Sequence, residues 1–486
     1  GKIATDKLAD YTEEQIDKIL QNMVRVAEEN AVMLAKMAVE ETGFGKVEDK
    51  TYKNHMASTI VYNYIKDMKC SGIIHEDPVN KMMEVADPVG LIMGIVPSTN
   101  PTSTAIYKSM IAIKARNAIV FSPHPSALQC TLKAATLMRD AAVAAGAPEN
   151  VIGCLSMPSM GATDELMKCK ETSMIIATGG PGMVKAAYSA GKPALGVGAG
   201  NSPSYIERTA DVAQSVKEIL ASKTFDNGTV CASEQSVICE ECNRDQVIAE
   251  FKKQGGYFMT AEETAKVCNL LFKNGGHSMS AKFVGRSAQV IATAAGISIP
   301  DGTRVLIGEQ QGVGDGYPLS YEKLTTVLAF YTVRDWHEAC ELSIKLLQNG
   351  IGHTMNIHTN DPQIVREFSR KPASRILVNT GGTQGGTGAS TALAPAFTLG
   401  CGTWGGSATS ENVTPMNLVN IKKVVYGLKD VTTLAQSDPT FRPDFGCCRG
   451  SNAAGAQPSP MQFSGSCNCT TGNQGLPAQD GINKIA

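Results

Sequence analysis

A cysteine in a polar loop is the first feature of the sequence that could carry chemistry. Residues 226–234 read Asp-Asn-Gly-Thr-Val-Cys-Ala-Ser-Glu, so Cys231 stands just ahead of the apolar run 236–238. A thiolate adds to an aldehyde to give a thiohemiacetal and, after oxidation, a thioester. The alternative is a small cysteine packed in the core, because the chain has 14 cysteines and free cysteine is commonly buried. The surrounding patterns must decide between these readings.

An asparagine between two prolines is a second candidate. Pro97-Ser98-Thr99-Asn100-Pro101 follows the apolar run 89–96. Prolines restrict the backbone on both sides of Asn100, so its amide could be held rigidly as a donor to an oxyanion. An ordinary Asn-Pro turn is the alternative.

Two glycine-rich segments could approach a ligand closely. Residues 178–182 read Thr-Gly-Gly-Pro-Gly and join an apolar run to a helix pattern, where glycines let the backbone approach a pyrophosphate. This segment does not match G-x-G-x-x-G. Residues 196–200 read Gly-Val-Gly-Ala-Gly, which suits a crossing of small residues between strands. Glu322, ahead of the apolar run 327–331, either binds ribose hydroxyls or faces solvent.

Length and composition bound the class of protein. The chain has 486 residues, which predicts two or more domains, and its 43% hydrophobic and 19% charged residues are typical of globular proteins. A net charge of −2 gives no basic surface for nucleic acid. No apolar run approaches the roughly 18 residues of a membrane span. With no secretory signal and scattered cysteines, a cytoplasmic location is expected.

The cysteine spacings do not predict a metal site. Cys239 and Cys242 have one half of a zinc spacing. The other close pairs, at 447–448 and 467–469, have different spacings.

The elements that must position these residues alternate between strand and helix. A first set of apolar runs leads into helix patterns, and these runs lie at 89–96, 118–121 and 174–177. A second set follows Cys231, at 236–238, 327–331, 355–358 and 376–378, with a helix pattern at 335–349. This alternation predicts an α/β fold with parallel sheets covered on both faces. Nucleotide sites in such folds lie at the carboxyl ends of the strands.

The N-terminal region is predicted to be helical. Thr12 and Gln15 have the spacing of a capping box, and apolar residues follow at helical intervals. The pair at 42–43, Thr-Gly, predicts the stop of this helix.

Taken in order along the chain, these patterns resemble the aldehyde dehydrogenase superfamily over about residues 10–430. Within it the likeness is to the coenzyme-A-acylating branch, as in bacterial ethanolamine and propanediol utilisation and in the bifunctional alcohol/aldehyde enzymes. The most specific segments are 398–407, TLGCGTWGGS, with 412–413 and 418–422, and 121–125, FSPHP. Hydrolytic members usually carry Lys where Ser122 stands, so the adenosine ribose must be held differently here.

The resemblance implies a role for each candidate residue. Cys231 is the nucleophile, and its backbone N–H forms an oxyanion hole with Asn100. Glu322 holds the nicotinamide ribose of NAD. His353 resembles a histidine that assists thiol deprotonation in the acylating branch, although a histidine satisfied by backbone is the alternative. The remaining residues implied to lie by the dinucleotide are Ser122, Pro123, Thr178, Gly179 and Gly180.

The identity of residue 197 predicts the product. Hydrolytic members carry Glu-Leu-Gly-Gly-Lys-Ser-Pro, and aligning 201–203 with its end puts Val197 at the Glu position. Valine cannot act as a general base for water, so the thioester can wait for the thiol of coenzyme A. The sequence therefore predicts oxidation of propionaldehyde or acetaldehyde to an acyl-CoA with NAD and coenzyme A. The rivals are a hydrolytic or semialdehyde dehydrogenase giving a free acid, and a non-catalytic shell-associated scaffold.

The resemblance also implies a domain plan and an assembly. A Rossmann-like NAD domain is expected at 1–227, a catalytic α/β domain at 228–401 and a return segment with an oligomerisation strand at 402–430. Strands at 73–85 and 419–426 would form the oligomerisation element. Isolated edge strands of this kind need a partner chain, so a homodimer or tetramer is expected.

The C-terminal residues 431–486 are predicted to be a flexible tail. Residues 437–480 are rich in Gly, Ser, Pro, Asn, Thr and Gln and have few large apolar side chains to offset the entropy of ordering. Ile482 and Ile485 suit one face of a short helix, or belong to a disordered end. By likeness to enzymes packed in bacterial microcompartments, the tail is predicted to bind shell proteins.

Overall fold

The computed structural model describes residues 1–273 and 277–442. The chain forms two compact units, Gly1–Tyr426 and Gly427–Ala486. The fold and the site described below belong to the first unit. In the second, the structure describes one short helix, α17 (Leu434–Ser437). The predictions for the tail after residue 442, including Ile482, Ile485 and the cysteines at 447, 448, 467 and 469, lie outside the described residues.

The first half of the large unit contains a five-stranded parallel sheet in the order β5–β4–β3–β6–β7. Its strands are β3 (Leu91–Val96), β4 (Ala118–Pro123), β5 (Ile152–Cys154), β6 (Thr172–Thr178) and β7 (Ala194–Val197). In β3, Ile92 and Val96 pack into one core while Met93 and Ile95 pack into another. Both faces are therefore covered, which is why the strand reads as a continuous apolar run.

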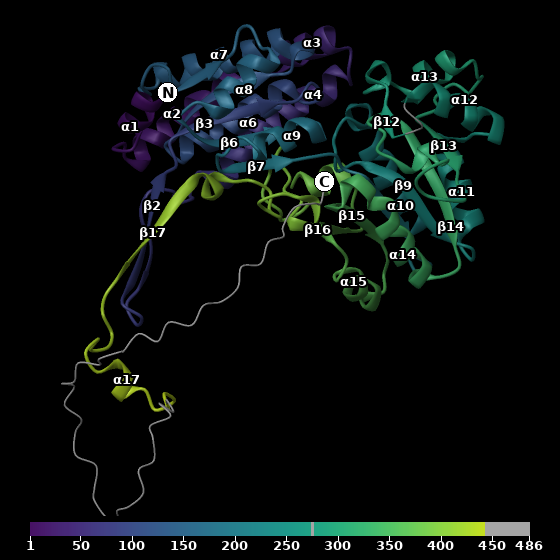
Figure 1. Cartoon of the computed structure of the whole chain (residues 1–486). Helices are drawn as coiled ribbons and strands as arrows, with labels where there is room; N and C mark the ends of the chain where they lie inside the picture. The colour runs from purple at the N-terminus through teal and green to yellow at the C-terminus, as the bar shows by residue number, and fades with distance from the viewer. Residues whose placement is uncertain (274–276, 443–486) are drawn as a thin grey trace, which may run out of the picture. The chain divides into compact units, whose positions relative to one another are not determined.

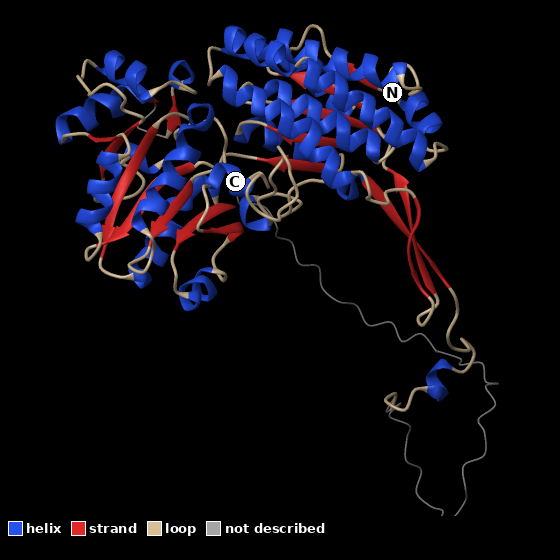
Figure 2. Ribbon diagram, turned by 180° about the vertical axis from the view of Figure 1, so that it is seen from behind, coloured by secondary structure: helices blue, strands red, loops and turns tan. Residues whose placement is uncertain are grey.

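Helices cover this sheet on both sides (Figures 1 and 2). The core containing Ile92 includes side chains of α6 (Pro101–Lys114) and α7 (Leu128–Ala144). The core containing Met93 includes side chains of α8 (Met160–Lys168) and α9 (Pro181–Tyr188). The remaining helices of this region are α1 (Lys2–Leu8), α2 (Glu13–Glu29), α3 (Ala31–Thr42), α4 (Val47–His55), a π-helical turn η1 (Met56–Ile60), α5 (Val61–Ile65) and η2 (Pro125–Ala127).

The predicted N-terminal helix begins as expected but does not run unbroken. Thr12 and Gln15 form the predicted capping box at the start of α2. The helix then stops at Asn30, whose φ of −109° and ψ of 3° leave the helical region and whose Nδ2 donates to the carbonyl of Val26. A second helix, α3, continues to the predicted stop, where Gly43 adopts a left-handed φ of 69°. The prediction of one helix was therefore wrong at Asn30, because its side chain offers the backbone a competing local hydrogen bond.

The second half of the large unit contains a seven-stranded parallel sheet in the order β10–β13–β14–β9–β8–β15–β16. Its strands are β8 (Ser202–Ile206), β9 (Glu234–Glu240), β10 (Gly256–Phe258), β13 (Val305–Glu309), β14 (Val327–Val333), β15 (Gly352–His358) and β16 (Ala373–Val378). Every apolar run predicted after Cys231 lies within one of these strands. Two parallel sheets alternating with helices confirm the predicted α/β class.

The helices around the large sheet again form two layers. One core contains side chains of α10 (Val212–Thr224) and α11 (Arg244–Lys253). The opposite core contains side chains of four helices, which are α12 (Ala261–Leu271), α13 (Ala288–Ala295), α14 (Trp336–Leu347) and α15 (Pro362–Phe368). The smaller elements of this region are η3 (Phe225–Gly228), β11 (Phe272–Lys273), β12 (Ser278–Met279), η5 (Ala281–Phe283), η6 (Pro318–Ser320), η7 (Gln348–Gly350), α16 (Gly382–Gly386), η8 (Thr403–Gly405) and η9 (Pro415–Leu418).

The chain passes between the two sheets through residues 198–201. Strand β7 is the edge of the five-stranded sheet, while β8, which follows directly, lies between β9 and β15 in the seven-stranded sheet. The glycine-rich segment at 196–200 is thus a crossing between strands of different sheets. Residues near this crossing can meet side chains from both sheets.

A three-stranded antiparallel sheet, β1 (Gly72–Asp77), β2 (Met82–Pro88) and β17 (Val419–Val425), extends away from the two larger sheets (Figures 1 and 2). Strand β2 is central, which leaves β1 and β17 as edges. Apolar side chains on β17 face solvent, with Ile421, Val424 and Val425 exposed by 47%, 42% and 64%.

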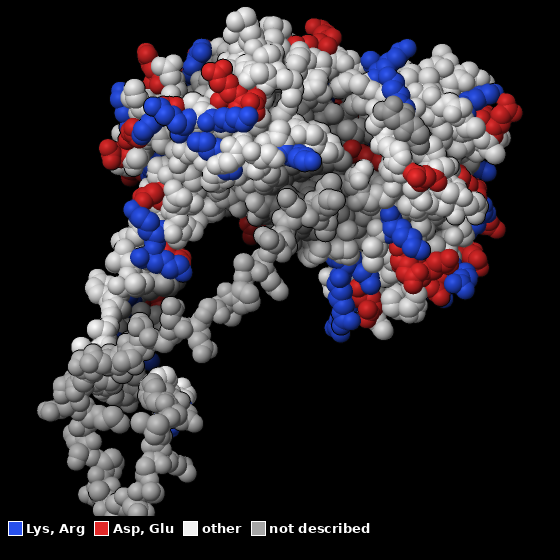
Figure 3. Space-filling view, viewed as in Figure 1, with Lys and Arg blue, Asp and Glu red and all other residues white. Residues whose placement is uncertain are grey.

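The described surface is mixed in charge. Acidic and basic side chains are interspersed over the face drawn in Figure 3. No helix in the described part of the chain combines the length and the apolar character needed to cross a membrane.

Candidate active site

Cys231 and Asn100, two of the three residues predicted to be catalytic, meet in one pocket of about 240 Å³. The small sheet supplies Asn100 and Gly179, from the segments that follow β3 and β6, and Val197, the last residue of β7. From the side of the large sheet come Cys231 and Glu322. The other described lining residues are Pro97, Ser98, Thr99, His124, Thr178, Gly180, Pro181, Gly198, Ala199, Thr229, Leu324 and Phe397. The site therefore lies at the carboxyl ends of β3, β6 and β7 in the small sheet, as sequence analysis predicts for this fold, but before the first residues of β9 and β14 in the large sheet.

A second pocket of about 390 Å³ adjoins the first and contains the remaining predicted ligand-binding residues. Ser122 and Pro123 line it together with apolar side chains such as Met160 and Met183. The two pockets share five lining residues, which are Pro97, His124, Thr178, Gly179 and Gly180. A long ligand could thus occupy both pockets by passing over the 178–180 turn.

The shared turn exposes backbone at the start of a helix. Gly180 is the N-cap of α9, and beyond the adjoining residues and the helix's own backbone nothing lies within 4 Å of where a Cβ would stand on Gly180 or on Gly182. The backbone at this helix N-terminus is therefore open to a ligand, and the helix dipole favours a negative charge there. Ser122 is less free, because its hydroxyl is hydrogen-bonded to the Thr163 hydroxyl at 2.8 Å.

His353 lies directly beside the candidate nucleophile. Its Nε2 atom is 3.1 Å from Cys231 Sγ, and its Nδ1 atom is 2.8 Å from the Thr354 hydroxyl. Burial, with a smaller contribution from Glu322, raises the pKa of the Cys231 thiol to about 12. Burial and the charge of Arg375 hold the pKa of His353 well below its ordinary value. The resting pair is therefore a neutral thiol against a neutral imidazole.

Arg375 fixes the strand that carries His353. Its Nη2 donates to the carbonyl of His353 at 3.0 Å and to the carbonyl of Gly400 at 2.7 Å. Its Nε donates to the Thr354 hydroxyl at 3.2 Å. This buried guanidinium was not singled out from the sequence, because its partners are mostly backbone carbonyls that leave no residue pattern.

The crossing between the sheets packs against the nucleophile. A Cβ on Gly200 would lie 1.9 Å from the carbonyl oxygen of Cys231, so this position requires glycine. The N–H of Gly200 donates to Glu322 Oε1 at 2.8 Å. Burial raises the pKa of Glu322 to about 7. Val197, the last residue of β7, is 2% exposed and presents only methyl groups.

A buried ion cluster lies behind Asn100 and was missed by sequence analysis. Lys53 Nζ, from α4, lies 2.6 Å from Asn100 Oδ1 and 2.5 Å from Asp226 Oδ2. Lys50 Nζ lies 2.8 Å from the same carboxylate oxygen. The spacing of two lysines on one helix face was the available signal, but it reads equally well as a solvated helix face. Their partner lies 173 residues further along the chain from Lys53.

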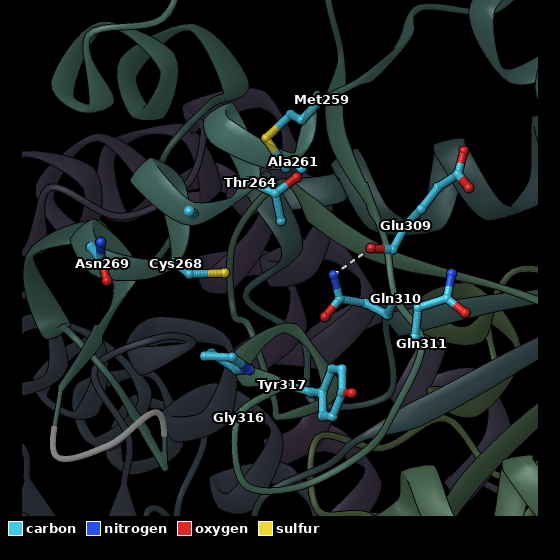
Figure 4. Close-up of a pocket in the computed structure, with 12 residues that line it drawn as sticks. Met259, Ala261, Thr264, Cys268, Asn269, Glu309, Gln310, Gln311, Gly316 and Tyr317 are labelled. Carbon is cyan, nitrogen blue, oxygen red and sulfur yellow. Dashed lines mark hydrogen bonds between the residues drawn. The ribbon is translucent and has the colours of Figure 1, made fainter.

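A pocket elsewhere in the large unit holds none of the predicted residues. Its volume is about 590 Å³, and it lies between α12 and the segment that follows β13. Figure 4 shows Thr264, Cys268, Gln310 and Tyr317 around it.

The half zinc spacing has a structural explanation. Cys239 packs in the core of the large sheet, and Cys242 is exposed. The described ranges contain no cluster of three or more His, Cys, Asp or Glu residues suited to a metal ion.

Comparisons with known proteins identify the family. The profile described as the aldehyde dehydrogenase family matches residues 2–260. The bifunctional aldehyde-alcohol dehydrogenase AdhE of Escherichia coli (strain K12) is 48% identical over 430 residues, which are 87% of this chain and 48% of that protein. This chain thus spans about half the length of the bifunctional relatives that it matches.

Solved structures extend the likeness to the fold. A crystal structure of an acetylating aldehyde dehydrogenase from Geobacillus thermoglucosidasius is 53% identical with a TM-score of 0.87, covering 88% of this chain and 95% of that one. A propionaldehyde dehydrogenase from Rhodopseudomonas palustris with bound propionyl-CoA is 27% identical with a TM-score of 0.80, covering 87% and 92%. These matches confirm the predicted aldehyde dehydrogenase-like fold, and the chain belongs to the aldehyde dehydrogenase family.

Proposed function

We propose that this chain oxidises a short-chain aldehyde, propionaldehyde or acetaldehyde, with NAD and coenzyme A to an acyl-CoA. The observation that carries the proposal is which side chains line the pocket around Cys231. Val197 lines the same pocket as the thiol and offers no base for water. Glu322, the acidic side chain among the described lining residues, accepts a hydrogen bond from the Gly200 N–H. A thioester on Cys231 would therefore persist until a stronger nucleophile arrives.

The first step is attack of the Cys231 sulfur on the aldehyde carbon. His353 Nε2 is the nearby acceptor for the thiol proton, at 3.1 Å from the sulfur. Burial and Arg375 lower the pKa of His353, which favours a proton transfer that accompanies C–S bond formation over one that precedes it. The carbonyl oxygen becomes an alkoxide, and Asn100 donates to it together with the Cys231 backbone N–H.

The cofactor site would use residues of both pockets. NAD, when bound, supplies the acceptor for the hydride whose loss turns the thiohemiacetal into a thioester. Thr178, Gly179 and Gly180 would bind its pyrophosphate, a proposal supported by the open glycine positions at the start of α9. Glu322 would hold the nicotinamide ribose, and Ser122 and Pro123 would line the adenosine end.

The second step is transfer between thiols. Coenzyme A loses its thiol proton to solvent as its sulfur attacks the thioester carbon, the acyl–S bond to Cys231 breaks, and the departing Cys231 sulfur takes back the proton that His353 accepted in the first step. A thiol needs less assistance than water because its thiolate is intrinsically more nucleophilic. The Geobacillus relative is an acetylating enzyme and the Rhodopseudomonas structure contains propionyl-CoA, which supports coenzyme A as this acceptor.

One assay tests the proposal against its rivals. NADH formation is measured with acetaldehyde and with propionaldehyde, with and without coenzyme A, and the product is identified by mass spectrometry. We expect NADH formation that depends on coenzyme A, and an acyl-CoA product. Free acid as the main product at saturating coenzyme A would show a hydrolytic enzyme. No NADH under any condition would favour a scaffold.

We propose the division of labour and the assembly as follows. Residues 1–227 bind NAD, 228–401 carry the nucleophile, and 402–430 return to the oligomerisation strand. The exposed apolar side chains on the edge strand β17 support a homodimer or tetramer formed through this sheet. Sedimentation of Val424→Lys against wild type tests it, since a charge on this edge should shift the protein toward monomer.

We also propose that the protein is cytoplasmic and that residues 431–486 bind the shell of a bacterial microcompartment. The Gly-, Ser- and Pro-rich composition of this segment supports a tether rather than a part of the enzyme.

A further inference from the structure

We infer that Lys53 is a positioning residue that orients the Asn100 amide toward the reacting oxygen; this inference rests on the function proposed above. Lys53 belongs to α4, an N-terminal helix outside both sheets, and its side chain is 2% exposed. Its Nζ atom lies 2.6 Å from Asn100 Oδ1. No residue pattern around either position indicates this contact.

The ammonium decides which end of the amide faces the pocket. A lysine ammonium carries only donors, so its short contact must be with the amide oxygen, and the NH₂ group is left on the other side. There Asn100 Nδ2 lies 3.1 Å from the Thr99 hydroxyl and 3.5 Å from the carbonyl of Thr229. A hydroxyl can donate or accept, and the carbonyl is distant, so these contacts distinguish oxygen from nitrogen poorly. Lys53 therefore provides the main preference for one orientation.

Lys53 is itself held by the loop that carries the nucleophile. Its Nζ atom donates to Asp226 Oδ2 at 2.5 Å and to the Thr229 hydroxyl at 3.0 Å. Asp226 is fully buried with a left-handed φ of 49°, and the backbone N–H of Lys46 donates to its Oδ1 at 2.8 Å. The cluster thus ties the position of Asn100 to the segment that ends at Cys231.

The charge of Lys53 also affects the strength of the amide as a donor. Burial lowers the pKa of Lys53 to about 8, while the Asp226 carboxylate opposes this change. A protonated Lys53 polarises the amide through its oxygen, which strengthens the N–H groups as donors to a developing alkoxide. Without Lys53 the amide could turn and present its oxygen lone pairs to that alkoxide instead.

These effects should appear in kcat more than in KM. The alkoxide exists only after the sulfur has attacked, so a donor to it stabilises the transition state and not the bound aldehyde. A residue that only supported the fold would change the amount of active protein. It would not lower kcat of the folded enzyme while leaving KM unchanged.

The chain offers a matched control. Lys53→Met keeps the length of the side chain and removes the ammonium, while Lys50 still neutralises Asp226. Lys50→Met removes the other ammonium from the same carboxylate and its bond to the Thr99 carbonyl, but Lys50 makes no hydrogen bond to the Asn100 side chain. Each variant is made in the wild-type background and in Asn100→Ala, and kcat for coenzyme-A-dependent NADH formation is compared.

We expect Lys53→Met to lower kcat by roughly 10²-fold, the loss typical of one oxyanion donor, with little change in KM. In the Asn100→Ala background the same substitution should have almost no further effect on kcat, because the amide that Lys53 orients is absent. Lys50→Met should change kcat by the same factor in both backgrounds. An equal loss from Lys53→Met in both backgrounds would overturn the inference.

Crystal structures of wild type and Lys53→Met provide a readout that does not need turnover. We expect the Asn100 amide to turn or move in the variant, and an unchanged amide bonded as before would overturn the inference. If Lys53→Met does not fold, Lys53→Arg keeps a charge beside Asp226. Its kcat should fall if the guanidinium loses Asn100 Oδ1 and stay near wild type if it keeps that contact. A rate that disagrees with the contact would also refute the role.

The failures of the two proposals are distinguishable. Wild-type enzyme that forms no NADH from any aldehyde would refute the proposed function. The comparison of crystal structures would still test whether Lys53 orients the Asn100 amide. Normal turnover by Asn100→Ala would leave the proposed function standing and refute the inference, because the residue that Lys53 orients would have no role.

Discussion

The Nε2 atom of His353 lies 3.1 Å from the sulfur of Cys231, although the two residues are 122 positions apart. The imidazole is fully buried and is held at Nδ1 by the hydroxyl of Thr354, which in turn accepts from Arg375. A nucleophile, an adjacent acceptor and a third group that orients the acceptor form the arrangement expected of an activated thiol.

Cys231→Ala should abolish NADH formation while the protein still folds and binds NAD, because Cys231 is the one cysteine among the described residues that line the pocket. Turnover and NAD binding are measured on the same preparation. Cys154→Ala, a cysteine on β5 outside the site pockets, is the control and should retain turnover. Activity in Cys231→Ala at even a tenth of normal would refute the nucleophile assignment.

Asn100→Ala should lower kcat by roughly 10²–10³-fold, the usual loss for one oxyanion donor. The reason is that the remaining donor, the Cys231 backbone N–H, cannot satisfy the alkoxide alone. The measurement is steady-state turnover with coenzyme A, with thermal unfolding as a check on the fold. A folded variant that loses less than about tenfold would remove Asn100 from the oxyanion site.

Alkylation of Cys231 in the ligand-free protein should accelerate steadily as the pH rises. Burial raises the pKa of this thiol to about 12, so the thiolate is a minor species at neutral pH and its fraction grows tenfold with each pH unit. The rate is followed by mass spectrometry of the Cys231 peptide after iodoacetamide treatment. A rate that levels off near neutral pH would instead indicate a thiol ionised by His353.

Val197→Glu should increase the share of free acid relative to acyl-CoA. A carboxylate at the end of β7 would enter the pocket that contains Cys231 and could activate water against the thioester. The product ratio is measured at saturating coenzyme A. Val197→Gln has nearly the same shape without the base, and equal free acid from both variants would contradict the explanation.

Deletion of the tail from Ser437 should leave NADH formation unchanged and abolish co-sedimentation with microcompartment shells. All residues assigned to the site belong to the unit that ends at Tyr426. The two measurements are made on the same truncated protein. Lost turnover would show that the tail contributes to the enzyme, and retained co-sedimentation would place shell binding elsewhere.

Seven strands of the two larger sheets and several local features could be predicted from the sequence because their causes are local. Residues 89–96 form a continuous apolar run because both faces of β3 are covered. Thr12 and Gln15 form a capping box because they are three residues apart on a helix that starts between them. The loop before β9 could be identified for the same reason, since its polar and glycine residues interrupt the apolar pattern.

Contacts between distant segments were decided by the tertiary structure. Lys53 contacts Asn100 and Asp226 because α4 lies beside both the loop after β3 and the loop before β9. In the sequence, a lysine on a helix gives no sign of a partner 173 residues away. His353 was a candidate by resemblance, but its contact with Cys231 depends on how β15 and the loop before β9 are placed by the order of the large sheet. Hydrophobic periodicity reports which face of an element is buried. It does not report which polar groups meet there, because that depends on sheet order and on crossings such as 198–201.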